Sequence, residues 1–226
     1  MLFSTTDFRY SKIRHNLSLL VGVMVLSSFS YGVKAEEVVA ENVDHIEVLK
    51  SLITTDVVKG LQAYGEEDVF QIVLGVCNDK NKGVMDSDFA TLDAQWKSEL
   101  GQAEQPAIAR ALTNPLSLRA TQMQAESDGL FLEIFVMDAK GLNCGQSAAT
   151  SDYWQGDEAK WQKTYLVGAE AVFIDEPEIS DKLGVWVSQV NLSIKDKKTG
   201  AALGAVTYEI NLTELERRKK QGVELF

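Results

Sequence analysis

A change of hydrophobic periodicity at Gly129 constrains the fold of this chain more than any other feature. Before Gly129, apolar residues recur every three or four positions, which is the spacing of amphipathic helices. After Gly129, apolar and polar residues alternate in short runs, which is the spacing of strands. Helices followed by strands with hairpin-length links predict an α+β domain with an antiparallel sheet, because βαβ units would interleave the two.

The helical part covers residues 36–128. Its first segment, residues 36–77, reads as one long amphipathic helix, and the pattern leaves open a break near Thr54 or Gly65. A turn at residues 78–83 precedes a shorter helix over 88–100, and a further helix over 106–126 has a break near Pro115. We expect the long first helix to cover one face of the sheet.

The sheet and pocket part covers residues 129–212, and a charged tail, 213–226, follows it. Five strands are predicted, at residues 130–138, 142–147, 171–175, 185–194 and 202–212. Three of them carry a polar residue near the middle: Glu133, Gln189 and Glu209. If these three share a face, they line a polar cleft; the alternative is a face that is simply solvated, as antiparallel sheets allow.

Residues 141–165 concentrate aromatic and polar side chains between two predicted strands. Tyr153, Trp154 and Trp161 lie here beside Lys160, and Asp175 ends the strand that follows. Such a segment indicates a pocket wall or lid. The alternative is that Trp154 and Trp161, seven residues apart on one helical face, cap the core.

The first 35 residues read as a cleavable signal peptide. Arg9, Lys12 and Arg14 precede a short apolar run at residues 17–27, and Ala35 ends a small-residue cleavage site. Cleavage would leave a single exported domain, residues 36–226, with no membrane span, and a bacterial periplasm is the expected compartment. Loss of four basic residues and one acidic residue would change the formal net charge from −11 to −14. A chain this acidic argues against nucleic acid as a partner.

Scarce histidine argues against most catalytic and metal sites. After cleavage only His45 remains, in an acidic helical run, so a catalytic triad or a multi-histidine metal site has no sequence support. No phosphate-binding glycine loop or nucleophile motif is present, and we expect neither enzyme activity nor a cofactor. Cys77 and Cys144 would meet an oxidising compartment, and the sequence leaves open whether they form a disulfide.

Three runs resemble a known family: FVMDAKGLNCGQS, TSDYWQGDEAKW and the stretch from Val172 to Leu212. Together they look like an extracytoplasmic Cache domain, also called a PDC sensor domain, of PAS-like fold. The elements that carry the resemblance are the strand-D-x-x-G-strand hairpin, the aromatic segment and the closing hairpin with G-x-x-x-G before its last strand. They cover roughly residues 130–212.

The resemblance implies a five-stranded antiparallel sheet flanked by helices, with a small-molecule pocket between the sheet and the segment after the second strand. Family members bind amino acids, amines or carboxylates and report to membrane receptors. In amino-acid-binding members an Asp on the final strand meets the ligand's ammonium group, and Glu209 stands in the corresponding place. The family's pocket Arg is missing, and Lys160 or Lys163 would substitute for it, although lysine lacks the two-pronged donor geometry of Arg. The chain ends soon after the domain, so we expect a stand-alone periplasmic member.

The leading hypothesis is therefore a sensing domain for a small polar or cationic metabolite, which reports to a membrane-bound sensor protein. Its alternative is an interaction module without a ligand that docks on a membrane partner through its helical half or the basic cluster at residues 217–220. A third hypothesis is that four clustered carboxylates bind Ca²⁺: Asp175, Glu176, Glu178 and Asp181. The alternative is that these residues form a solvated acidic turn.

Overall fold

The structure is a computed structural model that describes residues 35–223, with side chains from Asp44 onward. The predicted signal peptide, apart from Ala35, lies outside the described residues. Along the chain the elements are α1 (Ala35–Leu52), α2 (Thr55–Gly65), α3 (Asp68–Asn81), α4 (Asp86–Glu99), α5 (Pro106–Leu112), α6 (Pro115–Glu126), β1 (Phe131–Met137), β2 (Asn143–Gln146), α7 (Ala159–Gln162), β3 (Val172–Ile174), β4 (Glu178–Ile179), β5 (Trp186–Lys195), β6 (Ala202–Asn211) and α8 (Leu212–Gln221).

The long first helix is broken in both places that the sequence left open. Thr54 caps α2, because its side chain accepts a hydrogen bond from the backbone N–H of Val57 at 3.3 Å. A second break follows Gly65, where α2 ends and α3 begins at Asp68. Asn114 caps α6 in the same way, with Pro115 at the first helical position. Side-chain caps that the sequence carries therefore begin α2 and α6, whereas α3 begins after Glu67 without a side-chain cap hydrogen bond.

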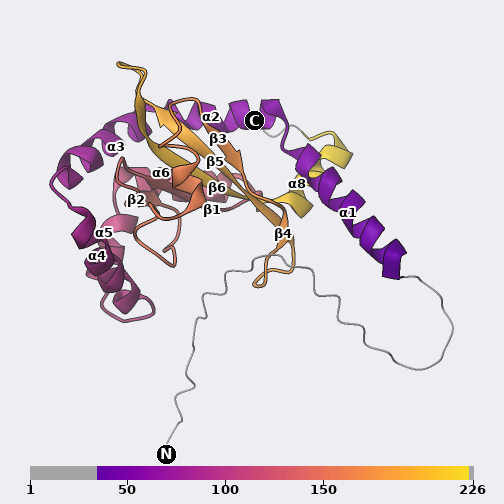
Figure 1. The fold of residues 1–226 in the computed structure, drawn as a ribbon, viewed down its shortest axis with the longest axis horizontal. Helices are drawn as coiled ribbons and strands as arrows, with labels where there is room; N and C mark the ends of the chain where they lie inside the picture. Colours follow the sequence, from indigo (N-terminus) through magenta and orange to yellow (C-terminus); the bar gives the residue numbers. More distant parts are fainter. Residues whose placement is uncertain (1–34, 224–226) are drawn as a thin grey trace, which may run out of the picture.

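The sheet is antiparallel, with the strand order β2-β1-β6-β5-β3 (Figure 1). These are the five predicted strands, and the predicted α+β class is confirmed. The sheet also has a strand that the sequence did not predict, the two-residue β4, which pairs with β5 at residues 186–187. Gly129, with φ of 84°, makes the turn between α6 and β1 that separates the helical part from the sheet.

Helices cover one face of the sheet, as the amphipathic pattern predicted. Contacts join α2 to β5, α3 to β6, and α6 to both β1 and β2. The main hydrophobic core fills this layer, and its largest fully buried side chains include Phe70, Leu116 and Tyr208. The Tyr208 hydroxyl donates to the backbone oxygen of Leu61 at 3.2 Å, which satisfies a polar group inside the core.

The stretch after residue 212, expected only as a charged tail, is helix α8 packed on the domain. Leu212 and Leu215 are buried, and α8 contacts α1 (Figure 1). Part of its basic cluster is engaged within the domain, because Arg218 pairs with Glu214 and donates to the backbone oxygen of Ser127. Within residues 35–223, no helix combines the length and apolar character needed to cross a membrane.

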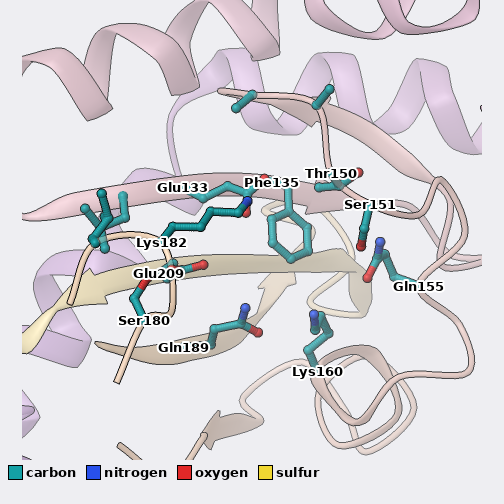
Figure 2. A pocket seen from close by; sticks show the side chains of 14 residues that line it. Glu133, Phe135, Thr150, Ser151, Gln155, Lys160, Ser180, Lys182, Gln189 and Glu209 are labelled. Carbon is teal, nitrogen blue, oxygen red and sulfur yellow. The ribbon is translucent and has the colours of Figure 1, made fainter. Parts of the chain in front are cut away.

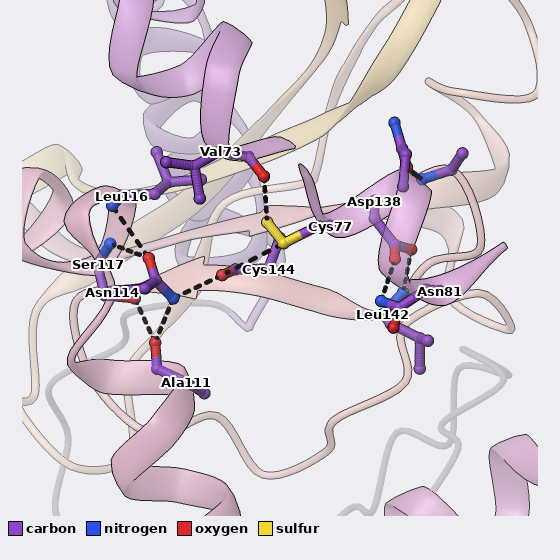
Figure 3. Close-up of a disulfide and its surroundings, with 12 residues drawn as sticks. Val73, Cys77, Asn81, Ala111, Asn114, Leu116, Ser117, Asp138, Leu142 and Cys144 are labelled. Carbon is purple, nitrogen blue, oxygen red and sulfur yellow. Dashed lines mark hydrogen bonds between the residues drawn. A yellow bond between two sulfur atoms is a disulfide. The ribbon is translucent and has the colours of Figure 1, made fainter. Parts of the chain in front are cut away.

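Cys77 and Cys144 form a disulfide that joins α3 to β2 (Figure 3). The Cα atoms are 6.0 Å apart, although the residues are separated by 67 positions in sequence. Beside the bond, the Asn114 side chain donates to the backbone oxygen of Cys144 at 2.8 Å. The start of α6, α3 and β2 are thus tied together at one edge of the sheet.

Candidate functional site

A row of polar side chains crosses the sheet face opposite the helices. Glu133 on β1 pairs with Glu209 on β6, and Glu209 pairs with Gln189 on β5. Directly paired residues point to the same face, so the three side chains lie next to one another. All three line a cleft (Figure 2), whose volume is about 370 Å³. The polar face of the sheet is therefore the floor of a cleft.

Two segments wall this cleft. Residues 148–160, after β2, contribute Thr150, Gln155 and Lys160. On the other side, the turn between β4 and β5 contributes Ser180 and Lys182 (Figure 2). The first wall is a loop that runs into the short helix α7, which carries Lys160, and the second wall is a loop. The carboxylates come from paired strands, so the acidic floor is the rigid part of the site.

Burial raises the pKa values of both carboxyl groups on the floor. The pKa of Glu133 rises to about 7, first through desolvation and then through the negative charge of Glu209. Lys160 and Lys182 oppose this rise. The pKa of Glu209 is also raised, first by desolvation, and a hydrogen bond from Gln189 opposes the rise. Both carboxylates would gain from a cation placed between them, because it would offset their desolvation and mutual repulsion.

Two lysines that line the cleft supply positive charge and form no ion pair within residues 44–223. These are Lys160 and Lys182, and both lower the pKa values of the floor carboxyls. Nζ of Lys160 lies 5.2 Å from the ring centroid of Phe135, which also lines the cleft. The cleft thus offers two acidic and two basic groups to a small polar molecule.

The tight turn between β1 and β2 positions the wall that follows it. The buried Asp138 carboxylate accepts backbone N–H bonds from Lys140 at 2.8 Å and Leu142 at 3.0 Å. Gly141 has φ of 78°, and a Cβ there would lie 2.6 Å from the Cα of Gly156. Only glycine fits this close approach, which seats the aromatic segment on the hairpin.

The predicted aromatic residues hold the wall and do not line the cleft. Trp154 stacks on Phe89 with ring centroids 4.7 Å apart, and its Nε1–H donates to the backbone oxygen of Lys140 at 2.9 Å. Tyr153 stacks on Trp96 at 5.3 Å. Both rings therefore fasten residues 148–160 to the hairpin and to α4.

Trp161 plays a similar part at the end of the wall. Its Nε1–H donates to the backbone oxygen of Asp138 at 3.0 Å, and its ring stacks on Tyr165 at 5.2 Å. It packs beside Phe135 on the polar side of the sheet. The alternative reading of Trp154 and Trp161 as packing residues agrees with these contacts, but they pack on the outer layer and not as a cap on the main core.

Asp175 lies one strand away from the cleft floor. Its carboxylate accepts a hydrogen bond from the Asn191 side chain at 3.1 Å, and Asn191 also accepts one from Thr207 at 2.7 Å. Burial raises the pKa of Asp175, and that hydrogen bond opposes the rise. Of the predicted ligand-binding residues, the structure thus brings together in the cleft Glu133, Gln189, Glu209 and Lys160, and places elsewhere Tyr153, Trp154, Trp161 and Asp175.

Sequence reasoning missed the second wall. Lys182 and Ser180 lie in a stretch that read as an acidic turn, and the short strand β4 that folds this turn back onto the cleft had no pattern of its own. The one signal was Lys182 itself, a single basic residue among carboxylates. Within residues 44–223, no group of three or more His, Cys, Asp or Glu side chains is arranged to hold a metal ion.

No family model matches the chain, and neither does any curated protein. Among solved structures, it is similar to the ligand-binding domain of the Campylobacter jejuni chemoreceptor Tlp3 in complex with 4-methylisoleucine, with 10% identity and a TM-score of 0.34. That match covers 69% of this chain and 65% of the other. A second is the ligand-binding domain of the Pseudomonas aeruginosa amino acid chemoreceptor PctC in complex with GABA, with 19% identity, a TM-score of 0.32, and coverage of 67% and 63%.

A third similar structure is the Escherichia coli DcuS sensor domain, with 18% identity and a TM-score of 0.34, covering 59% of this chain and 93% of that one. The chain spans slightly less than two thirds of the two chemoreceptor domains. All three structures are ligand-binding or sensor domains. The strand order and register of this chain themselves establish its fold.

Proposed function

We propose that this protein is an exported sensing domain that binds a small molecule carrying an ammonium group in the cleft over Glu133 and Glu209. The observation that carries the proposal is the paired register of these two carboxylates on adjacent strands, under walls that leave about 370 Å³. Lys160 and Lys182 line the same cleft and would pair with an anionic group on the same ligand. A zwitterion or a short polar amine therefore suits the cleft best.

Periplasmic location and a reporting role belong to the same proposal. The basic, apolar and small-residue regions of residues 1–35 support export, and a disulfide between Cys77 and Cys144 suits an oxidising compartment. A ligand that ties β1 and β6 to the two loop walls would bias their arrangement, which a membrane-bound sensor protein could read.

The test is a thermal-shift screen of the purified protein against amino acids, polyamines, short carboxylates, nucleobases and divalent cations. A ligand at about 100 times its dissociation constant adds roughly 2.7 kcal/mol, which raises the melting temperature of a domain this size by roughly 5 to 10 °C. We expect compounds with an ammonium group to stabilise the protein and Glu209→Gln to abolish their effect.

The matched control is Glu104→Gln, which removes the same charge from an exposed position that does not line the cleft. It should leave the shift unchanged. A screen in which every compound class leaves the transition unmoved would overturn the proposal. It would then favour the alternative, an interaction module that docks on a membrane partner.

A further inference from the structure

A second cavity lies on the helical side of the domain. It has a volume of about 360 Å³ and is lined by α3, α4, α5, the start of α6, β2 and Tyr153. It shares no lining residue with the cleft. The disulfide between Cys77 and Cys144 forms part of its wall, beside Val73 and Asn114 (Figure 3). We call it the helical-side cavity.

The charges of the helical-side cavity are all of one sign. Lys80 on α3 and Arg110 on α5 line it, and none of its lining residues is acidic. Both side chains are exposed, and within residues 44–223 neither takes part in an ion pair or a side-chain hydrogen bond. Two unpaired cations that line the same cavity attract an anion, and the guanidinium fork suits a carboxylate.

The interior of this cavity is apolar and aromatic. Val73, Leu92 and Ala107 line it, and Trp96 and Tyr153 contribute a stacked pair of rings. In the described part of the chain, the Tyr153 hydroxyl has no hydrogen-bond partner. Arg110 is close enough to lower the pKa of Tyr153, against a rise caused mainly by desolvation. An apolar body would fill the interior while the phenol and the guanidinium meet the same anion.

The side-chain oxygen of Asn143 is a buried hydrogen-bond acceptor at this cavity. Asn143 lines the cavity and is only 3% exposed. Its Nδ2 donates to Oγ1 of Thr150 at 2.8 Å and to the backbone oxygen of Asp152 at 3.0 Å, but its Oδ1 has no partner within the described residues. Buried acceptors are normally paired, so this oxygen needs a donor, which a water or a bound molecule would supply.

We infer that the helical-side cavity is a second binding site, which takes a small carboxylate with an apolar or aromatic body and a hydroxyl or amino donor. The carboxylate lies at Arg110, Lys80 and the Tyr153 hydroxyl, the body lies against Trp96, and the donor reaches Oδ1 of Asn143. This site has the opposite charge preference to the cleft over Glu133 and Glu209.

The experiment is isothermal titration of the purified protein with 4-hydroxyphenylacetate, which combines a carboxylate, a ring and a phenol donor. Tyramine, which replaces the carboxylate by an ammonium group, and phenylacetate, which lacks the donor, are the comparison compounds. We expect 4-hydroxyphenylacetate to bind more tightly than phenylacetate. Arg110→Gln and Lys80→Gln should each weaken its binding by about five-fold or more, the effect of one exposed charge pair at the upper end of its range.

Three further variants make the result specific. Lys82→Gln removes an equivalent exposed charge from the end of α3 outside the cavity and should leave the affinity unchanged. Tyr153→Phe keeps the ring and should weaken binding, whereas Glu209→Gln in the cleft should not. The inference is overturned if millimolar 4-hydroxyphenylacetate produces no binding heat, or if its binding survives Arg110→Gln and Lys80→Gln but is lost in Glu209→Gln.

Discussion

Glu133 makes the stability of this domain depend on pH in a direction opposite to that of most carboxylates. Its pKa rises from the ordinary 4.5 to about 7 in the folded protein, chiefly because the group is desolvated beside Glu209. A raised folded-state pKa means that the folded protein holds this proton more tightly than the unfolded chain does. Its contribution to stability is therefore full below about pH 4.5 and is lost as the pH rises to about 7.

The magnitude follows from the two pKa values. A change from 4.5 to about 7 corresponds to about 3 kcal/mol lost above neutral pH. Because Glu133 keeps partial contact with water, which screens its charge, we expect about half of this, or about 1 to 2 kcal/mol. Glu133→Gln replaces the carboxyl by a neutral group of the same shape. The variant should be close to the wild type at about pH 4.5 and more stable by that amount at about pH 8.5.

The assay is urea denaturation at these two pH values, followed by tryptophan fluorescence. Glu104→Gln, at an exposed position, serves as the control and should change the free energy of unfolding little at either pH. A Glu133→Gln variant whose stability relative to the wild type is the same at both pH values would refute the reasoning. So would a variant that loses stability at about pH 8.5.

Two further predictions concern the framework around the cleft. Replacing Cys77 and Cys144 by Ala removes a link across 67 residues, and the added entropy of the unfolded chain should lower the free energy of unfolding by about 4 kcal/mol. Urea denaturation of the variant and of the reduced wild type should show the same loss. An unchanged midpoint would contradict this prediction. Gly145→Ala would place a Cβ 2.6 Å from Cγ of the buried Leu116 and cost about 1 to 3 kcal/mol. Gly75 lies inside α3, and a Cβ added there would have nothing within 4 Å. Gly75→Ala should therefore increase the free energy of unfolding by up to about 1 kcal/mol and raise the melting temperature. Equal effects of the two glycine substitutions would refute this argument.

The sequence predicted which strands carry the polar residues of the cleft floor, but it did not predict how these strands align with one another. Alternation tells which residues of one strand share a face, but it does not say which residue of the next strand lies opposite. The short hairpin between β5 and β6 aligns Gln189 with Glu209, and the pairing of β1 with β6 then brings Glu133 beside them. The three polar residues therefore share a face of the sheet, as the predicted cleft required, because of strand pairings that no single strand specifies.

Roles of aromatic side chains were harder to predict, because an indole ring serves a ligand and a backbone carbonyl equally well. Trp154 and Trp161 both donate to carbonyls of the β1–β2 hairpin, a contact that depends on the tertiary position of the wall. Lys182 escaped prediction for a similar reason, since it reaches the cleft only through the fold of its loop. Cys77 and Cys144 could not be paired from their spacing, which carries no information about their distance in space.

The most direct test of the central claim is a crystal structure of the protein with the compound that stabilises it most in the thermal-shift screen. We predict the ammonium nitrogen of that compound within hydrogen-bond distance of a carboxylate oxygen of Glu133 or Glu209, with any anionic group toward Lys160 or Lys182. A compound bound outside the cleft, or one that turns an anionic group toward the two glutamates, would contradict the account.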